Sequence, residues 1–286
     1  MPGLVAPHSH QLHAADGTPL HVTDYLLPAH SAHGSVVIMH GLGEHSGRYR
    51  RLAQFLAECG MSVRCYDHRG HGRSGGDRGD VINGDAIVED AQRIVDEFSA
   101  RFRDAPFLLG HSMGGLFAAR FALARLAPLR GLILSSPALA VPMSGTQKLM
   151  LSVMHTVAPR LGVPNGLQSK FLSHDMAVVA AYRADPLVHN KISARLLRSM
   201  LSSIDYCMAQ AHTLSVPTLM LVAGEDHLVD LEGSKQFFAK LPPALAQFEQ
   251  FDGFYHELFN EVDAARPLAQ LKRWLLAQED AARVRY

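Results

Sequence analysis

The stretch FLLGHSMGGLFAAR, residues 107–120, decides the fold. An apolar run typical of a buried strand ends at Leu109, and the turn Gly110–Gly114 leads directly into an apolar helix. A serine between glycines at this place is typical of a nucleophile elbow, a strained turn that projects the hydroxyl away from the backbone. Glycines flank it because side chains there would collide with the strand or the helix. We therefore predict Ser112 as a nucleophile, with the backbone N–H of Met113 facing the same space.

Strands and helices alternate on both sides of this turn. The predicted strands are His10–Ala14, Leu20–Leu27, Ser35–Met39, Ser62–Tyr66, Pro106–Leu109, Leu129–Leu134, Thr218–Ala223 and Ala246–Phe251. The predicted helices are Arg48–Glu58, Asp85–Arg101, Met113–Leu126, Leu231–Leu241 and Val262–Gln278. This order predicts an α/β protein with a mostly parallel central sheet flanked by helices.

The alternation is interrupted between the strands that end near Leu134 and begin at Thr218. The intervening residues, roughly Pro137–Leu214, show helical patterns and no good strand. We expect a helical cap inserted between two core strands, with core residues 1–136, cap residues 137–214 and core residues 215–286.

A serine hydroxyl needs a base to remove its proton, and a base of this kind needs an orienting acid. On a fold with such an elbow the acid and then the histidine follow the serine along the chain, after successive strands. Asp226 follows one strand within GEDHLVD, and His256 follows the next within DGFYHELF. They are the predicted partners of Ser112. Glu225 and Asp230 are the alternative acids, and Asp230 better suits the start of the next helix.

The developing oxyanion of an acyl transfer needs hydrogen-bond donors. The strand Ser35–Met39 ends in His40-Gly41, and the loop after it would lie beside the elbow. We expect the backbone N–H groups of Leu42 and Met113 to form the oxyanion hole, where one such donor is typically worth about 3 kcal/mol of barrier.

Four strings, HGLGEHSGRY, DHRGHGRS, GHSMGG and GEDHLVD with YHELFNE, resemble the α/β-hydrolase superfamily. The resemblance is to its monoacylglycerol lipase and lysophospholipase branch, grouped with serine hydrolases of the serine aminopeptidase S33 type, and it covers nearly the whole chain. It implies an α/β-hydrolase fold, the same triad and oxyanion hole, and substrate-binding roles near the glycerol end for Glu44 and Arg48. The mammalian lipases have a second histidine three positions after the catalytic one, where this chain has Phe259, so we expect glycerol recognition to differ.

The predicted cap bears on the substrate. Leu149, Met150, Val153, Met154 and Val157 recur at helical spacing and form one apolar face. This face suits a flexible acyl chain, with Met150 and Met154 as binding residues, although closing the cap onto the core is the alternative. Tyr182, in the only cap string that resembles the family, is a further candidate. The face could also touch a membrane or micelle surface, but it lacks a polar side rich in lysine and arginine.

Composition excludes other function classes. Lys+Arg and Asp+Glu both number 27, so no net charge recruits nucleic acid. The three cysteines form no CxxC pair, which predicts reduced thiols in a cytoplasmic protein. The Asp67–Gly72 loop could suggest metal ligands, but no further carboxylate or cysteine completes a set, so we expect no metal and no cofactor.

We therefore expect a serine carboxylic ester hydrolase that cleaves monoacylglycerols or lysophospholipids through an acyl-enzyme on Ser112. The alternatives are an aminopeptidase or amidase, a small-ester esterase, and an acyltransferase on the same fold. An aminopeptidase needs carboxylates for the substrate ammonium, and the first half of the cap has none. A binding protein without catalysis does not require the complete triad.

Overall fold

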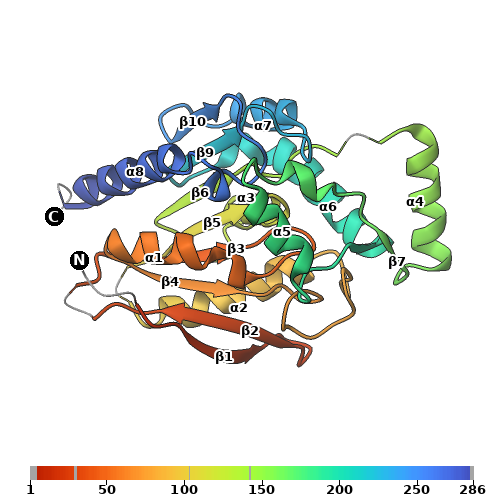
Figure 1. The fold of residues 1–286 in the computed structure, drawn as a ribbon, viewed down its shortest axis with the longest axis horizontal. Coiled ribbons are helices and arrows are strands. Elements are labelled where there is room, and N and C mark those ends of the chain that lie inside the picture. Colours follow the sequence, from red (N-terminus) through yellow and green to blue (C-terminus); the bar gives the residue numbers. More distant parts are fainter. Residues whose placement is uncertain (1–4, 29–30, 103, 142, 284–286) are drawn as a thin grey trace.

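The computed structural model describes residues 5–28, 31–102, 104–141 and 143–283. The predicted core and cap segments also include the remaining residues, and for these the prediction lies outside the described residues. Its main sheet has eight strands in the order β1-β2-β4-β3-β5-β6-β9-β10 (Figure 1). The pairs β1–β2 and β2–β4 are antiparallel and all other neighbours are parallel. The predicted fold class is thereby confirmed. The strands are β1 (His8–His13), β2 (Pro19–Tyr25), β3 (Gly34–Met39), β4 (Met61–Tyr66), β5 (Phe107–His111), β6 (Gly131–Ser135), β9 (Thr218–Ala223) and β10 (Ala246–Phe251).

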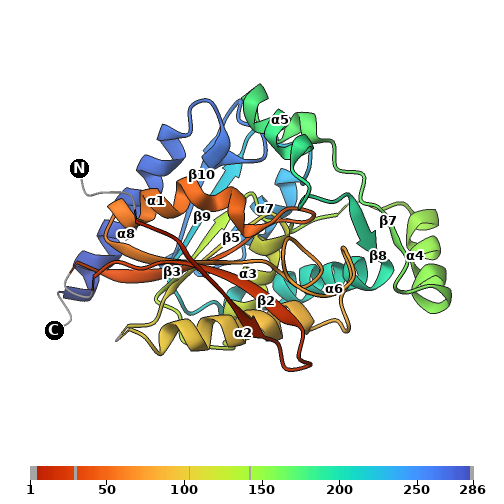
Figure 2. The same ribbon diagram turned by 60° about the horizontal axis from the view of Figure 1, so that its bottom comes forward.

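Helices cover both faces of this sheet. On one face lie α1 (Arg50–Glu58) and α8 (Ala265–Arg283), and on the other lie α2 (Ala86–Ser99), α3 (Met113–Leu123) and α7 (Leu231–Phe238). In Figure 2, α1 and α2 lie on opposite sides of the strands. Successive strand residues point to opposite faces, so Val36 joins one hydrophobic cluster while Val37 joins the other. A parallel strand buried on both sides explains the apolar runs without polar alternation.

The predicted cap covers the residues between the neighbouring strands β6 and β9. They contain α4 (Gly145–Val157), β7 (Gly162–Pro164), η2 (Ser169–Phe171), α5 (Met176–Ala184), β8 (Lys191–Ser193), α6 (Ala194–Gln210) and η3 (Ala211–Thr213). The expectation of no strand here is wrong, because β7 and β8 form an antiparallel pair. Each has three residues, too few to show an alternating pattern. Helix α6 packs on α3 and so joins the insertion to the core.

Several element boundaries differ from the expectation. The predicted helix Arg48–Glu58 begins with the 3₁₀ turn η1 (Ser46–Tyr49), whose N-terminus is capped by the His45 side chain. The predicted helix from Val262 is preceded by the 3₁₀ turn η4 (Leu258–Asn260) and forms as α8 only from Ala265. Among the described residues no helix is both long and apolar enough to span a bilayer.

Helix α4 stands at the edge of the molecule, away from the sheet (Figure 1). Its apolar face is turned outward: Leu149 is 67% exposed, Met150 66%, Val153 53% and Val157 77%. The alternative that this face closes the cap onto the core is therefore wrong, and its predicted contact with an acyl chain stays a prediction. The reason is that α4 turns Leu151 and Ser152 toward α6, and α6 itself packs on the core.

Candidate active site

Ser112 lies in the tight turn between β5 and α3, with φ 54° and ψ −120°. This backbone is strained for a residue with a side chain, at a cost of about 1–3 kcal/mol. The glycines that flank it are required by space. A Cβ on Gly114 would lie 2.2 Å from the carbonyl oxygen of Met39, and one on Gly110 would lie 2.4 Å from that of Gly114. The predicted elbow geometry is present, and it holds the Ser112 backbone at the carboxyl ends of the central strands.

Asp226 and His256 meet beside this turn. The acid follows β9 and the histidine follows β10, and Oδ2 of Asp226 lies 2.7 Å from Nδ1 of His256. The side chains are only 2% and 4% exposed. Oδ1 of Asp226 accepts the backbone N–H groups of Leu228 and Val229, which fixes the carboxylate.

The two alternative acids lie elsewhere. Asp230 caps the N-terminus of α7 by accepting the backbone N–H of Glu232, as the sequence predicts. Glu225 is half-exposed and lies 3.5 Å from His227. The structure therefore brings Asp226, of the three candidates, to His256.

The environment adjusts the pKa values of this pair. Burial disfavours the imidazolium of His256, but the Asp226 carboxylate and its hydrogen bond outweigh burial and raise the pKa of His256. Burial alone would raise the pKa of Asp226, yet the imidazole charge and hydrogen bonds hold it below its ordinary value. The carboxylate is thus kept ionised opposite a histidine that binds a proton more readily.

Ser112 and His256 line one small space of about 20 Å³, together with Gly41, Leu42, Glu44, His111, Leu167, Leu172, Tyr182, Leu228 and Glu257. Within the described chain no hydrogen bond joins the Ser112 hydroxyl to His256. Such bonds are often loose in an enzyme without substrate and tighten in the complex.

The loop expected to supply the oxyanion hole lies against the elbow. A Cβ on Gly41 would lie 3.3 Å from the Cβ of Ser112, and Leu42 lines the same space as the serine. Met113 is the first residue of α3, so its N–H has no partner within the helix. The Glu44 carboxylate accepts the N–H of Gly41 at 2.6 Å and fixes the start of the loop.

Glu44 and Arg48 belong to a buried cluster of charges. Arg48 donates to Glu44 at 2.5 Å and, through two nitrogens, to both carboxylate oxygens of Glu257 at 2.5 and 2.7 Å. The ring of Tyr182 covers the guanidinium, whose central carbon lies 4.8 Å from the ring centre. Burial opposes the guanidinium charge, but the two carboxylates overcome it and raise the pKa of Arg48. The charge of Arg48 is therefore neutralised by two carboxylates of the same chain.

Glu257 is a site residue that the sequence analysis missed. It follows the predicted catalytic histidine, and its carboxylate also accepts the side-chain amide of Asn260 at 2.9 Å. Its position directly after His256 is the sequence feature that could have identified it. Its contact with Arg48, which lies 209 residues away along the chain, arises only from the fold.

The insertion is tied to the segment that carries His256. The backbone N–H of His256 donates to the carbonyl oxygen of Phe171 at 3.4 Å, and that of Glu257 donates to Leu172 at 2.8 Å. A second contact joins Nε2 of His45, in the loop after β3, to Oδ2 of Asp185, at the end of α5, at 2.8 Å. These contacts hold η2 and the end of α5 over Ser112.

The Asp67–Gly72 loop packs near the oxyanion loop, as expected. Asp67 accepts both the N–H and the hydroxyl of Ser46, and the His68 N–H donates to the ring of His40. Burial lowers the pKa of His40 to about 4, which keeps this ring neutral. In the described residues no group of three histidine, cysteine or carboxylate side chains is arranged to hold a metal ion.

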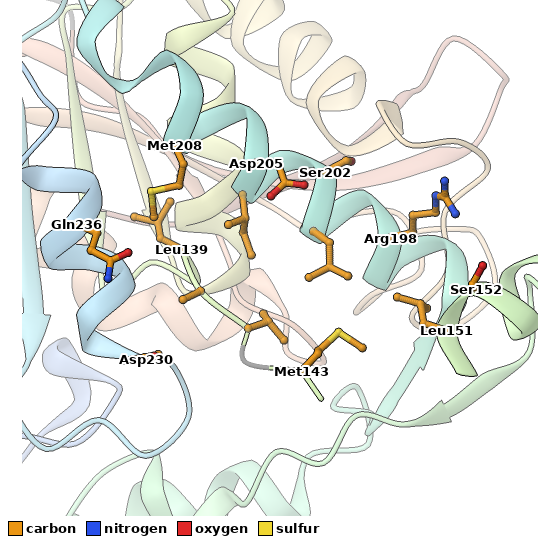
Figure 3. Close-up of a pocket in the computed structure, with 14 residues that line it drawn as sticks. Leu139, Met143, Leu151, Ser152, Arg198, Ser202, Asp205, Met208, Asp230 and Gln236 are labelled. Atoms are coloured by element: carbon orange, nitrogen blue, oxygen red, sulfur yellow. The ribbon is translucent and has the colours of Figure 1, made fainter. Parts of the chain in front are cut away.

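A larger cavity of about 610 Å³ lies between the start of the insertion, α6 and α7 (Figure 3). Leu139, Met143, Leu151 and Met208 give it apolar walls, and Arg198 and Asp205 add charge. Neither Met150 nor Met154 lines this cavity or the space in front of Ser112. Their predicted role in substrate binding gains no support from their position.

Comparison with known proteins supplies the context for this geometry. Residues 30–263 match the model of the family described as serine aminopeptidase, S33. A monoacylglycerol lipase of Mycolicibacterium smegmatis is 32% identical over 261 residues, which cover 90% of this chain and 92% of the relative. The phospholipase YtpA of Bacillus subtilis is 33% identical, with 79% of this chain and 88% of the relative covered. The crystal structure of the Paleococcus ferrophilus monoacylglycerol lipase superposes with a TM-score of 0.82 and 34% identity, covering 91% of this chain and 99% of that one.

Proposed function

Because this chain belongs to the serine aminopeptidase S33 family of α/β-hydrolases, we propose that it hydrolyses monoacylglycerols or lysophospholipids through an acyl-enzyme on Ser112. It is a serine ester hydrolase, like the relatives of which it covers 92% and 99% of the length. The observation that carries the assignment of residues is the 2.7 Å contact between Asp226 and His256 beside a serine held at φ 54°.

In the proposed mechanism Ser112 Oγ attacks the ester carbonyl while His256 Nε2 takes the hydroxyl proton. Asp226 holds the tautomer in which Nδ1 carries the other proton, and it stabilises the imidazolium that forms. The intermediate collapses when His256 returns the proton to the leaving alcohol oxygen. A water molecule, activated by the same histidine, then attacks the acyl-enzyme and releases the fatty acid.

The tetrahedral intermediates carry a negatively charged oxygen. We propose that this oxygen accepts hydrogen bonds from the backbone N–H groups of Leu42 and Met113. Donors fixed in advance stabilise this charge without reorganisation during the reaction. The hydrogen bond from Gly41 to Glu44 supports the assignment, because it holds the loop in place before substrate arrives.

We further propose that residues 137–214 act as a cap that meets the lipid surface carrying the substrate. The outward face of α4 supports this, since Leu149, Met150, Val153 and Val157 are all more than half exposed. Leu161 and Met176, elsewhere in the same segment, are 56% and 65% exposed. Apolar side chains gathered on one exposed segment are typical of an interaction site.

The test is turnover of a substrate panel by the purified protein. Monoacylglycerols, lysophosphatidylcholine, p-nitrophenyl esters and aminoacyl anilides are compared by kcat/KM. We expect the glycerol or lysophospholipid esters to be cleaved and the anilides to be poor. Preferential cleavage of the anilides would overturn the proposal in favour of an aminopeptidase.

A further inference from the structure

The buried charges of Glu44, Arg48 and Glu257 are unbalanced. Two carboxylates share one guanidinium, so the cluster carries an excess of one negative charge. The side chains of both glutamates are 5% exposed and that of Arg48 is 10% exposed. Water therefore screens this excess charge much less than it would at the protein surface.

Only two of the three residues line the substrate space. Glu44 and Glu257 line the space in front of Ser112 and His256, whereas Arg48 is absent from its described lining. Arg48 instead lines a second small space with Tyr49, Leu52 and Phe259, and both glutamates line this space as well. On the substrate side the guanidinium is covered by the ring of Tyr182. The substrate space thus meets the negative members of the cluster and not the positive one.

From this arrangement we infer that Glu257 is a specificity-determining residue, which makes the site accept neutral or cationic leaving groups and reject anionic ones. The inference rests on the proposed esterase function and narrows its substrate class. A glycerol hydroxyl can donate a hydrogen bond to a carboxylate, and a trimethylammonium group is attracted by its charge. A phosphate monoester at the same place meets like charge, with no free guanidinium to compensate it.

The experiment compares three esters of one acyl chain, used below their micellar concentrations. They are 1-octanoylglycerol, octanoylcholine and 1-octanoylglycerol 3-phosphate, which differ in the charge of the leaving group. We expect kcat/KM for the phosphate to be at least about tenfold below that for octanoylglycerol at low ionic strength, the scale of one unit charge in a partly buried site. Octanoylcholine should equal or exceed octanoylglycerol.

Glu257→Gln keeps the shape and one acceptor for Arg48 but removes the excess charge. In this variant the kcat/KM for octanoylglycerol divided by the kcat/KM for the phosphate ester should fall at least about threefold, on the same electrostatic scale. Glu249→Gln, at an exposed position of β10, removes the same charge far from the cluster and should leave the ratio unchanged. Because each comparison is a ratio within one protein, a general loss of activity in a variant cancels.

Equal turnover of the three esters by the wild-type protein would overturn the inference while leaving the esterase function intact. Discrimination that persists in Glu257→Gln would overturn the assignment to this residue. A protein that cleaves none of the three esters would overturn the proposed function and this inference with it.

Discussion

Asp226 is bound to His256 through Oδ2 at 2.7 Å, while its other oxygen is held by two backbone N–H groups. The carboxylate therefore cannot rotate away from the imidazole without breaking both backbone contacts. In the proposed mechanism, such a fixed acid determines which ring nitrogen of His256 is free to take the proton of Ser112.

Asp226→Asn should reduce kcat by about 10⁴-fold, because the amide favours the wrong histidine tautomer. Asp230→Asn is the matched control, since asparagine also caps a helix and Asp230 touches α7 and not His256. Steady-state kinetics on one ester measure both. A larger loss in Asp230→Asn would mean that the acid has been assigned to the wrong position.

Ser112→Ala should lower kcat by about 10⁶-fold with no loss of folding, because members of a triad act as a unit. A fluorophosphonate probe should label the wild-type protein at Ser112 alone. The buried hydroxyls of Ser46 and Ser74 donate to the carboxylate and to the backbone carbonyl of Asp67, and neither lies at a strained turn before a helix. Peptide mapping of the labelled protein identifies the site, and a label on either of these serines would contradict the elbow assignment.

The pH profile of kcat/KM should have an acidic limb above the ordinary histidine range. His256 must be neutral to accept the serine proton, and its pKa is raised, chiefly by Asp226 against the effect of burial. Activity therefore falls as the pH drops through this raised pKa. Removing a nearby negative charge destabilises the imidazolium, so Glu257→Gln should move the limb to lower pH, while Glu249→Gln should not move it. A limb that moves upward in Glu257→Gln would contradict this sign.

Val153→Glu should weaken hydrolysis of monoacylglycerol embedded in lipid vesicles while leaving cleavage of a water-soluble short-chain ester unchanged. Val153 is 53% exposed on the outward face of α4, so a charge there costs little in the free protein but opposes contact with an apolar surface. Gln247→Glu, at an exposed position of β10, is the control. Sedimentation with vesicles measures binding directly, and equal binding of both variants and the wild type would remove α4 from the proposed contact.

The core fold was predictable because its decisive signals are local. The apolar run before Leu109 and the glycines around Ser112 determine the elbow, and buried parallel strands place Asp226 and His256 at one edge of the sheet. Each of these residues follows its own strand directly. Short-range sequence patterns therefore contain most of the information about this part of the site.

The remaining features depend on long-range packing. The sequence pattern of α4 shows an apolar face but not which way it points, and here α6 occupies the place on the core. Glu257 lies in the loop after β10, the last strand of the sheet, and Arg48 lies in η1. The two residues pair only because the folded sheet brings this loop to η1. The resemblance to lipases implied substrate-binding roles for Glu44 and Arg48, but not that Glu257 pairs with this arginine.

The carbonyl oxygens of Phe171 and Leu172, which accept the N–H groups of His256 and Glu257, have a consequence for how such proteins diversify. The insertion leaves and rejoins the core at neighbouring strands, β6 and β9, so its two ends are close enough for a foreign segment to be grafted in its place. A graft that closes the chain but lacks two correctly placed carbonyls would leave the N–H groups of the loop around His256 without their acceptors. Recombination between relatives should therefore exchange this insertion together with the loop around His256, as one inherited block.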